Sequence, residues 1–325
     1  MKNHKEVRVF SIPMNVERQV TINKPISSVF DFLADFRNWS SWSPWIRMEP
    51  TSKIEVSGAG GSVGHSQSWE GEIVGSGKMT LNEAQKPTRI DIRLEFFKPW
   101  SNHATTQFVL SQEGNATVVR WKMMGSLPFF MFFFRNMMNA MIASDYERGL
   151  NMLKERLETG KVLSKLEQKG VTQQKGFYFV GIRRSCSEAD LSASMAKDFS
   201  QLQELVRTGK LDEPQSAVSL YHKVDMVKKT FDYTAALTYA SKPAKIPANL
   251  EAGNIPDHSA LQVDHWGPYR HIGNAWSTAI SSVRMKKLKP QKSNPSWERY
   301  VSMPGQVADE QIHTQIFAPV NRTSA

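Results

Sequence analysis

Residues Phe133 to Glu158 read FFRNMMNAMIASDYERGLNMLKERLE, and this stretch decides the fold of the first half of the chain. Its apolar residues recur at helical spacing, which predicts one long helix. Five strand-length runs separated by Gly, Asn or Pro precede it, at residues 64–72, 77–84, 89–97, 103–110 and 117–124. That spacing predicts an antiparallel meander. A curved antiparallel sheet that holds a long helix leaves a cavity between them, so the pattern predicts an α+β domain built around a ligand-sized interior.

Composition limits the classes of protein to which the chain can belong. A length of 325 residues exceeds the usual size of a single core, so two domains are expected. Cys186 is the only cysteine, which excludes an internal disulfide and suits a reducing compartment. The first residues lead into no long apolar segment of the secretory kind. We therefore expect a cytoplasmic protein.

Three further classes of partner or cofactor find no support in the sequence. The apolar run Leu127–Phe134 ends at Arg135, well short of the roughly 20 residues of a spanning helix, so no membrane span is expected. The net charge of +10 comes without a helix-turn-helix, zinc-finger or RNA-binding signature, so no nucleic-acid partner is expected. No Ser-His-Asp, Cys-His or metal-ligand spacing stands out, and we expect neither a metal nor a cofactor.

Short motifs in the first half point to a known family. They are Asn38-Trp39-Ser40-Ser41-Trp42-Ser43-Pro44-Trp45, Trp69-Glu70-Gly71, Lys98-Pro99-Trp100, Val118-Val119-Arg120-Trp121 and Tyr146-Glu147-Arg148-Gly149-Leu150. In this order they resemble the polyketide cyclase/dehydrase branch of the START-like (SRPBCC, helix-grip) superfamily, over nearly all of residues 1–160. The resemblance implies a ligand cavity and no particular chemistry. Ordinary core packing remains the favoured role for the tryptophans, ahead of ligand contact.

A polar stretch separates this half from the next. Residues 161–175 are poor in large apolar side chains and are predicted to be a linker. Beyond it, one order of elements occurs twice, as strand, helix, strand, strand, over residues 177–239 and again over 259–319. Two such units predict a pseudo-symmetric α+β domain, with a small-molecule groove where the halves join.

Trp297-Glu298-Arg299-Tyr300-Val301 is the most informative stretch of the second half. Successive strand side chains point to opposite faces, so Glu298 and Tyr300 share one face while Trp297, Arg299 and Val301 share the other. If the first face lines a pocket, it offers a carboxylate that must find a cation or a proton. Alternation alone favours the alternative, a surface glutamate.

Motifs around this stretch resemble the GyrI-like small-molecule-binding domain, which is also the effector-binding module of many AraC- and MerR-type regulators. They are Ser219-Leu220-Tyr221, Thr230-Phe231-Asp232-Tyr233, Asp264-His265-Trp266-Gly267-Pro268-Tyr269 with Trp276, and Trp297-Glu298-Arg299-Tyr300. The resemblance covers most of residues 176–320, within a domain predicted over residues 176–325. It implies that Glu298 lies at the bottom of an aromatic pocket for amphipathic, often cationic, ligands. It also implies wall positions for Tyr300, Tyr269 and Tyr221 or Tyr233, although the last two fit the core equally well.

These observations give one main hypothesis for function and two alternatives. The main hypothesis is a two-module binder or sensor of hydrophobic or amphipathic small molecules. It does not itself bind DNA, because a START-like domain stands where a regulator would carry its DNA-binding domain. Some stand-alone relatives are hydrolases, so a hydrolase with Glu298 in its site is the first alternative. An interaction protein of the gyrase-inhibitor kind, on resemblance only, is the second.

Overall fold

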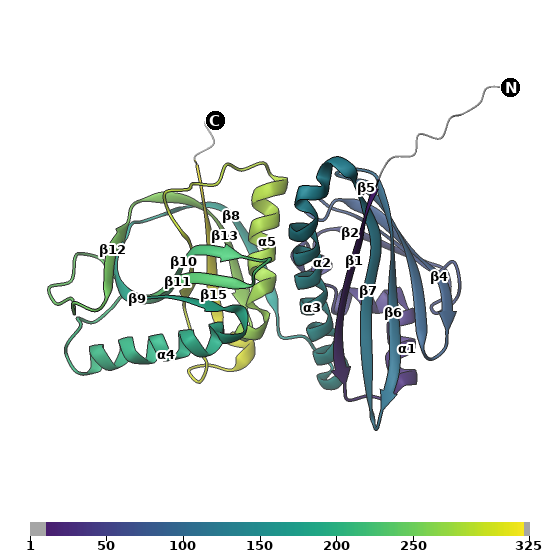
Figure 1. The fold of residues 1–325 in the computed structure, drawn as a ribbon. Helices are drawn as coiled ribbons and strands as arrows, with labels where there is room; N and C mark the ends of the chain where they lie inside the picture. The colour runs from purple at the N-terminus through teal and green to yellow at the C-terminus, as the bar shows by residue number, and fades with distance from the viewer. Residues whose placement is uncertain (1–10, 322–325) are drawn as a thin grey trace. The chain divides into compact units, whose positions relative to one another are not determined.

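The computed structural model describes residues 11–321, without the side chains of Ser11 and of residues 128–130. The chain divides into two compact units at Val162 and Leu163. Each unit combines one antiparallel sheet with helices, as Figure 1 shows. The predicted α+β class is confirmed, with a helix-grip unit followed by a second α+β unit.

The first unit is a seven-stranded sheet in the order β1-β7-β6-β5-β4-β3-β2. Its strands are β1 (Ser11–Ile22), β2 (Lys53–Ser57), β3 (Ser66–Glu70), β4 (Ser76–Gln85), β5 (Arg89–Lys98), β6 (Asn102–Glu113) and β7 (Ala116–Pro128). Its helices are α1 (Ile26–Ala34), α2 (Pro44–Met48) and the long α3 (Arg135–Thr159), with 3-10 segments at Phe36–Ser41 and Phe129–Phe134. α3 ends where Gly160 takes a left-handed φ of 85° and donates its N–H to the carbonyl of Arg156. Glycine suits this position because other residues are strained there.

Aromatic side chains fill the middle of the space between α3 and the sheet. The Trp121 ring stacks on Phe108 with centroids 5.0 Å apart and on Tyr146 of α3 at 3.8 Å. The Thr106 hydroxyl accepts from the Trp121 indole at 2.7 Å and lies 2.9 Å from the Tyr146 hydroxyl, so both polar groups are satisfied. Trp39 and Trp42 pack on the same cluster. These three tryptophans are core residues, the role that the sequence analysis favoured over ligand contact.

The second unit is one continuous eight-stranded sheet in the order β12-β9-β11-β10-β14-β15-β13-β8. Its strands are β8 (Lys165–Gln174), β9 (Phe177–Ser187), β10 (Ser216–Asp225), β11 (Thr230–Tyr239), β12 (Glu251–Ile255), β13 (His258–Trp266), β14 (Ser296–Tyr300) and β15 (His313–Val320). α4 (Glu188–Arg207) packs on β9 and β11, and α5 (Ile272–Met285) packs on β13 and β15. The two helices cover the two halves of one face, and β10 and β14 meet at the centre between them.

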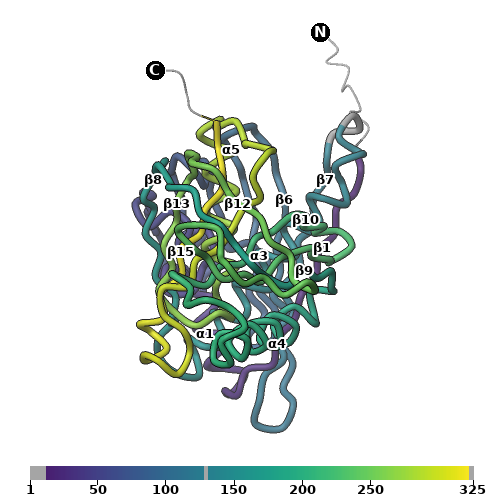
Figure 2. The backbone as a smooth tube through the Cα atoms, turned by 90° about the vertical axis from the view of Figure 1, so that its left-hand side faces the viewer, coloured from purple at the N-terminus to yellow at the C-terminus, as the bar shows by residue number. Residues whose placement is uncertain are grey.

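The predicted linker is wrong over most of its length, because residues 165–174 form strand β8. β8 pairs with β13 along the edge of the second sheet, and Figure 2 shows β8, β13 and β15 running side by side. Exposed and half-buried side chains alternate along it, without the large apolar residues that would have marked a strand. β8 and β12 hold equivalent places, since each precedes one repeat and pairs with the first strand of the other. The two repeats are thus interlocked rather than merely adjacent.

Candidate functional site

Glu298 lies on the central strand β14 and points to the face that carries α4 and α5. Directly across the strand pair stands Ser219 of β10, and on the other side Ile316 of β15, which belongs to the core under α5. Glu298 is only 3% exposed. The surface interpretation that alternation alone favoured is therefore wrong, because the sheet is covered by helices on this side.

Three donors converge on the Glu298 carboxylate. The Tyr300 hydroxyl donates to Oε2 at 2.7 Å, and the Tyr221 hydroxyl donates to Oε1 at 3.1 Å. The Trp276 indole N–H, from α5, donates to the same Oε1. Tyr300 is itself 2.8 Å from the Ser219 hydroxyl. The carboxylate is thus held in one orientation by neutral groups from two strands and a helix.

Among residues 11–321, no lysine, arginine or histidine pairs with Glu298. Burial raises the pKa of its carboxyl group, and the hydrogen bonds from Trp276, Tyr300 and Tyr221 only partly oppose that rise. Burial also raises the pKa of Tyr221 and of Tyr300 well above the ordinary value, so both remain neutral donors. A buried carboxylate with neutral partners alone either takes up a proton or attracts a cation.

Aromatic rings enclose the carboxylate on several sides. The Tyr269 ring, from the turn before α5, lies 5.5 Å from the Tyr300 ring, and Phe199 of α4 meets the same ring edge-on at 5.4 Å. Tyr221 meets Trp276 edge-on at 5.2 Å. Both helices and both central strands therefore contribute to one aromatic cluster. Aromatic faces favour cations as well as apolar groups.

Among the predicted wall residues, Tyr233 is the one whose hydroxyl bonds to a different carboxylate. It lies directly across from Tyr221 on β11, but its hydroxyl donates to Asp198 of α4 at 2.8 Å. Asp198 is fully buried and also accepts from Arg184 of β9. This group fixes α4 on the sheet beside the cluster. Tyr233 is fully buried in the core beneath α4 and supports that helix through Asp198.

The sequence analysis named Trp276 only as part of a motif. It did not single out Phe199 of the cluster or Asp198 beside it. The available signals were weak. Trp276 is the single tryptophan on a helix whose buried positions carry small side chains, and Asp198 is a charge on the sheet-facing side of α4.

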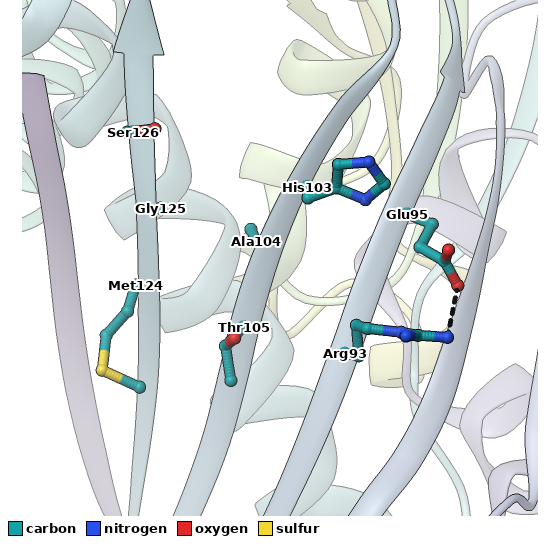
Figure 3. A pocket seen from close by; sticks show the side chains of 8 residues that line it. All are labelled: Arg93, Glu95, His103, Ala104, Thr105, Met124, Gly125 and Ser126. Carbon is teal, nitrogen blue, oxygen red and sulfur yellow. Dashed lines mark ion pairs between the residues drawn. The ribbon is translucent and has the colours of Figure 1, made fainter. Parts of the chain in front are cut away.

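The first unit offers an open hollow of about 540 Å³ on the outer face of its sheet, shown in Figure 3. Side chains of three neighbouring strands surround it, with Arg93 paired to Glu95 at 3.3 Å, His103 and Met124. Its floor is backbone, because Ala104 and Gly125 oppose each other there. The hollow lies on the side of the sheet away from the aromatic core. It is therefore distinct from the interior cavity that the helix-grip pattern predicts between the sheet and α3.

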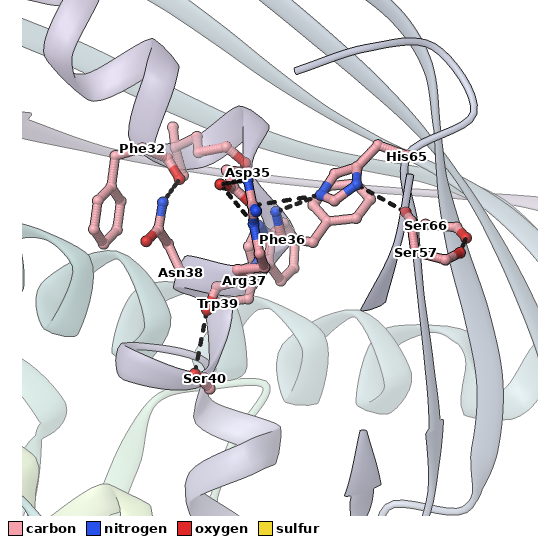
Figure 4. Close-up of polar contacts among 11 residues, drawn as sticks. Phe32, Asp35, Phe36, Arg37, Asn38, Trp39, Ser40, Ser57, His65 and Ser66 are labelled. Atoms are coloured by element: carbon pink, nitrogen blue, oxygen red, sulfur yellow. Dashed lines mark hydrogen bonds and ion pairs between the residues drawn. The ribbon is translucent and has the colours of Figure 1, made fainter. Parts of the chain in front are cut away.

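His65 is held in the interior of the first unit, as Figure 4 shows. Its Nε2 accepts from the backbone N–H of Phe36 at 2.9 Å, so Nδ1 carries the hydrogen and donates to the Ser57 carbonyl at 2.9 Å. The ring stacks on Phe36 with centroids 4.7 Å apart. His65 thus ties the segment after α1 to β2, which is a structural role.

Residues 11–321 contain neither a metal-ligating cluster nor a membrane-spanning helix. No group of three or more His, Cys, Asp or Glu side chains in this part of the chain could hold a metal ion. No helix within it is long and apolar enough to cross a membrane.

Comparison with known families assigns both halves. Residues 13–158 match the family described as polyketide cyclase / dehydrase and lipid transport, and residues 171–321 match the GyrI-like small molecule binding domain. No curated protein matches the chain.

Solved structures resemble one half or the other. The C-terminal domain of EcmrR is 19% identical over 50% of this chain and 100% of its own, with a TM-score of 0.38. SAV2435 bound to tetraphenylphosphonium is 18% identical over 48% of this chain and 94% of its own, at 0.36. The Aha1 dimer from Colwellia psychrerythraea is 18% identical over 46% of this chain and 98% of its own, at 0.35.

Proposed function

We propose that this chain is a cytoplasmic binder or sensor of amphipathic small molecules. Its residues 13–158 belong to the polyketide cyclase/dehydrase family, and its residues 171–321 belong to the GyrI-like family. Both families comprise small-molecule-binding domains, so a small-molecule ligand is the common element. The finer proposal is that the second unit takes a cation with an apolar, aromatic body.

The buried carboxylate of Glu298 is the observation that carries this proposal. Leaving a carboxylate buried without a cation is costly, and its three neutral donors offset only part of that cost. A ligand cation would supply the missing charge, and the rings of Tyr269, Tyr300 and Trp276 would accept its apolar body. Hydroxyl and indole donors also hold the carboxylate in place in advance, which reduces the ordering cost of binding.

The first unit is proposed to bind an uncharged apolar ligand near the first turns of α3. Met141 and Ile142 are half-buried there, whereas the middle of the helix lies against closely packed aromatics. Methionine is adaptable and suits apolar ligands of varied shape. Met141→Trp should fill such a site and abolish binding of an apolar dye. Equal dye binding in the variant and the wild type would place the site elsewhere.

A hydrolase with its site around Glu298 is the second candidate, and one observation favours it. The carboxyl group has a raised pKa and touches the Tyr300 hydroxyl, which in turn touches Ser219. A carboxyl group with a raised pKa can serve as a general acid or base near neutral pH. Binding still ranks first, because nothing in the cluster is an activated nucleophile.

Native mass spectrometry of the freshly purified full chain tests the proposal directly. We expect a co-purified small molecule, or a complex with added tetraphenylphosphonium that Glu298→Gln weakens. Glu213→Gln is the matched control, since it removes the same charge from an exposed loop of the same unit. If both variants bind tetraphenylphosphonium as the wild type does, Glu298 is not part of a cation site.

A further inference from the structure

The opposite face of the second sheet carries an arginine whose charge is not paired. Strand alternation places Arg299 on the face away from Glu298, and its guanidinium lies 5.0 Å from the centre of the Trp297 ring and 5.4 Å from that of Phe317. Among residues 11–321, its one hydrogen bond to another side chain is donated to the Gln315 carbonyl oxygen, at 3.5 Å. A guanidinium has five N–H donors, so most of its capacity is unused by the protein.

No carboxylate within residues 11–321 forms an ion pair with Arg299. Burial lowers the pKa of its guanidinium, and no nearby negative charge offsets that effect. Asp264, two strands away in the same cross-strand row, is the nearest acid in register. It already accepts from Gln262 at 2.7 Å and from Gln315 at 3.3 Å, and it lies 3.0 Å from the His313 imidazole. Its oxygens are therefore occupied by neighbours other than Arg299, while its negative charge remains in the row.

A flat, partly open surface lies in the next row of the same face. The His313 ring stacks on the Trp266 indole with centroids 4.6 Å apart and planes 10° apart. Lys165 of β8 lies 5.4 Å from the centre of the Trp266 ring. Val301, which stands across from His313 and two residues from Arg299, is 53% exposed, so this end of the face is reached by solvent.

We propose that Arg299, His313 and Trp266 form a second small-molecule site, on the opposite face of the sheet from Glu298, for a planar monocarboxylate. The free N–H pairs of Arg299 match the two oxygens of a carboxylate. The face of the His313 ring that is turned away from Trp266 offers a flat surface for its aromatic body.

The charge of the ligand follows from the charges around the site. Arg299 is a single full positive charge, and Asp264 stands in the same row. The positive charges of Arg299 and of Lys165 at the rim exceed the negative charge of Asp264 by one. The second charge of a dianion such as a phosphate monoester would therefore be desolvated in the site without a partner. The site is therefore complementary to one negative charge, the reverse of the Glu298 cluster.

Calorimetry of the full chain with 1-naphthoate and its neutral counterpart 1-naphthamide tests the proposal. We expect the wild type to bind naphthoate at least about tenfold more tightly than naphthamide, and Arg299→Gln to remove that preference. Arg299→Lys keeps the positive charge and a long aliphatic chain, so it controls for a loss of folding in Arg299→Gln. It should lose the two-oxygen contact and bind naphthoate more weakly than the wild type.

Two controls separate this site from the Glu298 cluster. Arg284→Gln removes an exposed charge at the end of α5 and should leave naphthoate binding unchanged. Glu298→Gln should leave it unchanged as well, and tetraphenylphosphonium should not compete with naphthoate. Equal affinity of the wild type for the acid and the amide, or unchanged binding in both Arg299 variants, would overturn the proposal. Phenyl phosphate binding more tightly than naphthoate would overturn its choice of a monoanion.

Discussion

Replacing Glu298 by glutamine should separate binding from catalysis, because the cluster can accept the amide without rearranging. Tyr221 and Trp276 both donate to Oε1, which the glutamine carbonyl would replace. The new amide nitrogen would then face Tyr300. The Tyr300 hydroxyl can turn to donate to Ser219, 2.8 Å away, and accept from the amide. The variant therefore loses a charge while keeping its shape and hydrogen bonds.

The size of the effect follows from what is lost. A hydrogen bond or contact with a charged partner is worth about 1.5–3 kcal/mol, so a cationic ligand should bind Glu298→Gln roughly 10- to 150-fold more weakly. A neutral ligand of the same shape gains no such contribution from the carboxylate of the wild type. Its affinity should change by less than about threefold, equivalent to less than about 0.7 kcal/mol.

Calorimetry with tetraphenylphosphonium and neutral triphenylphosphine oxide measures both quantities. If Glu298 is instead a general acid or base, affinities stay nearly equal while turnover of a strained electrophilic substrate falls roughly 10²- to 10⁴-fold. Tyr300→Phe then shows whether the phenol contributes its hydrogen bond or only the packing of its ring, because the variant keeps the ring and removes the hydroxyl. Equal affinities for both ligands in the wild type and in Glu298→Gln would refute the reasoning altogether.

Four further results are expected. Tetraphenylphosphonium should bind more tightly as pH rises through the raised pKa of Glu298, because a proton and the cation compete for the carboxylate, and the Gln variant should show no such dependence in pH-resolved titrations. Fragment 163–325 should melt cooperatively on its own, whereas fragment 175–325 lacks β8, exposes the edge of β13 and should be less stable in urea. Asp198→Asn should cost about 3 kcal/mol of unfolding free energy in urea, at the low end for a buried pair because the Arg184 side chain is 34% exposed. His65→Ala removes two hydrogen bonds and a ring stack from the core and should cost the first unit about 2–4 kcal/mol in the same assay.

Matched controls make the two stability predictions specific. Asp232→Asn breaks the exposed pair with Arg183 and should cost less than about 1 kcal/mol. His103→Ala removes an exposed histidine of the first unit and should stay within about 0.5 kcal/mol. A cost for Asp198→Asn or His65→Ala no larger than that of its control would contradict the structural role assigned to that residue.

Most of the fold can be predicted from local sequence patterns. Periodicity, the Gly, Asn and Pro residues between strands, and short motifs predict the two domain types and the order of the main strands and helices. Strand alternation predicts the shared face of Glu298 and Tyr300. These features depend on neighbours a few residues apart. The strands that escaped prediction are β2, β8 and β12. β8 and β12 are edge strands of the second sheet and β2 of the first, and an edge strand need not carry the apolar alternation by which strands are recognised.

The sequence by itself determined that a carboxylate and a phenol share one face of a strand. Only the tertiary structure decided that this face is buried and that its partners are Tyr221, 77 residues away, and Trp276 on α5. It likewise decided that the Tyr233 hydroxyl donates its hydrogen bond to Asp198 and not to Glu298. The reason is physical: strand alternation fixes the side to which a residue points, but the pairing of β10 with β14 and the seating of α5 arise from long-range packing that no local period records.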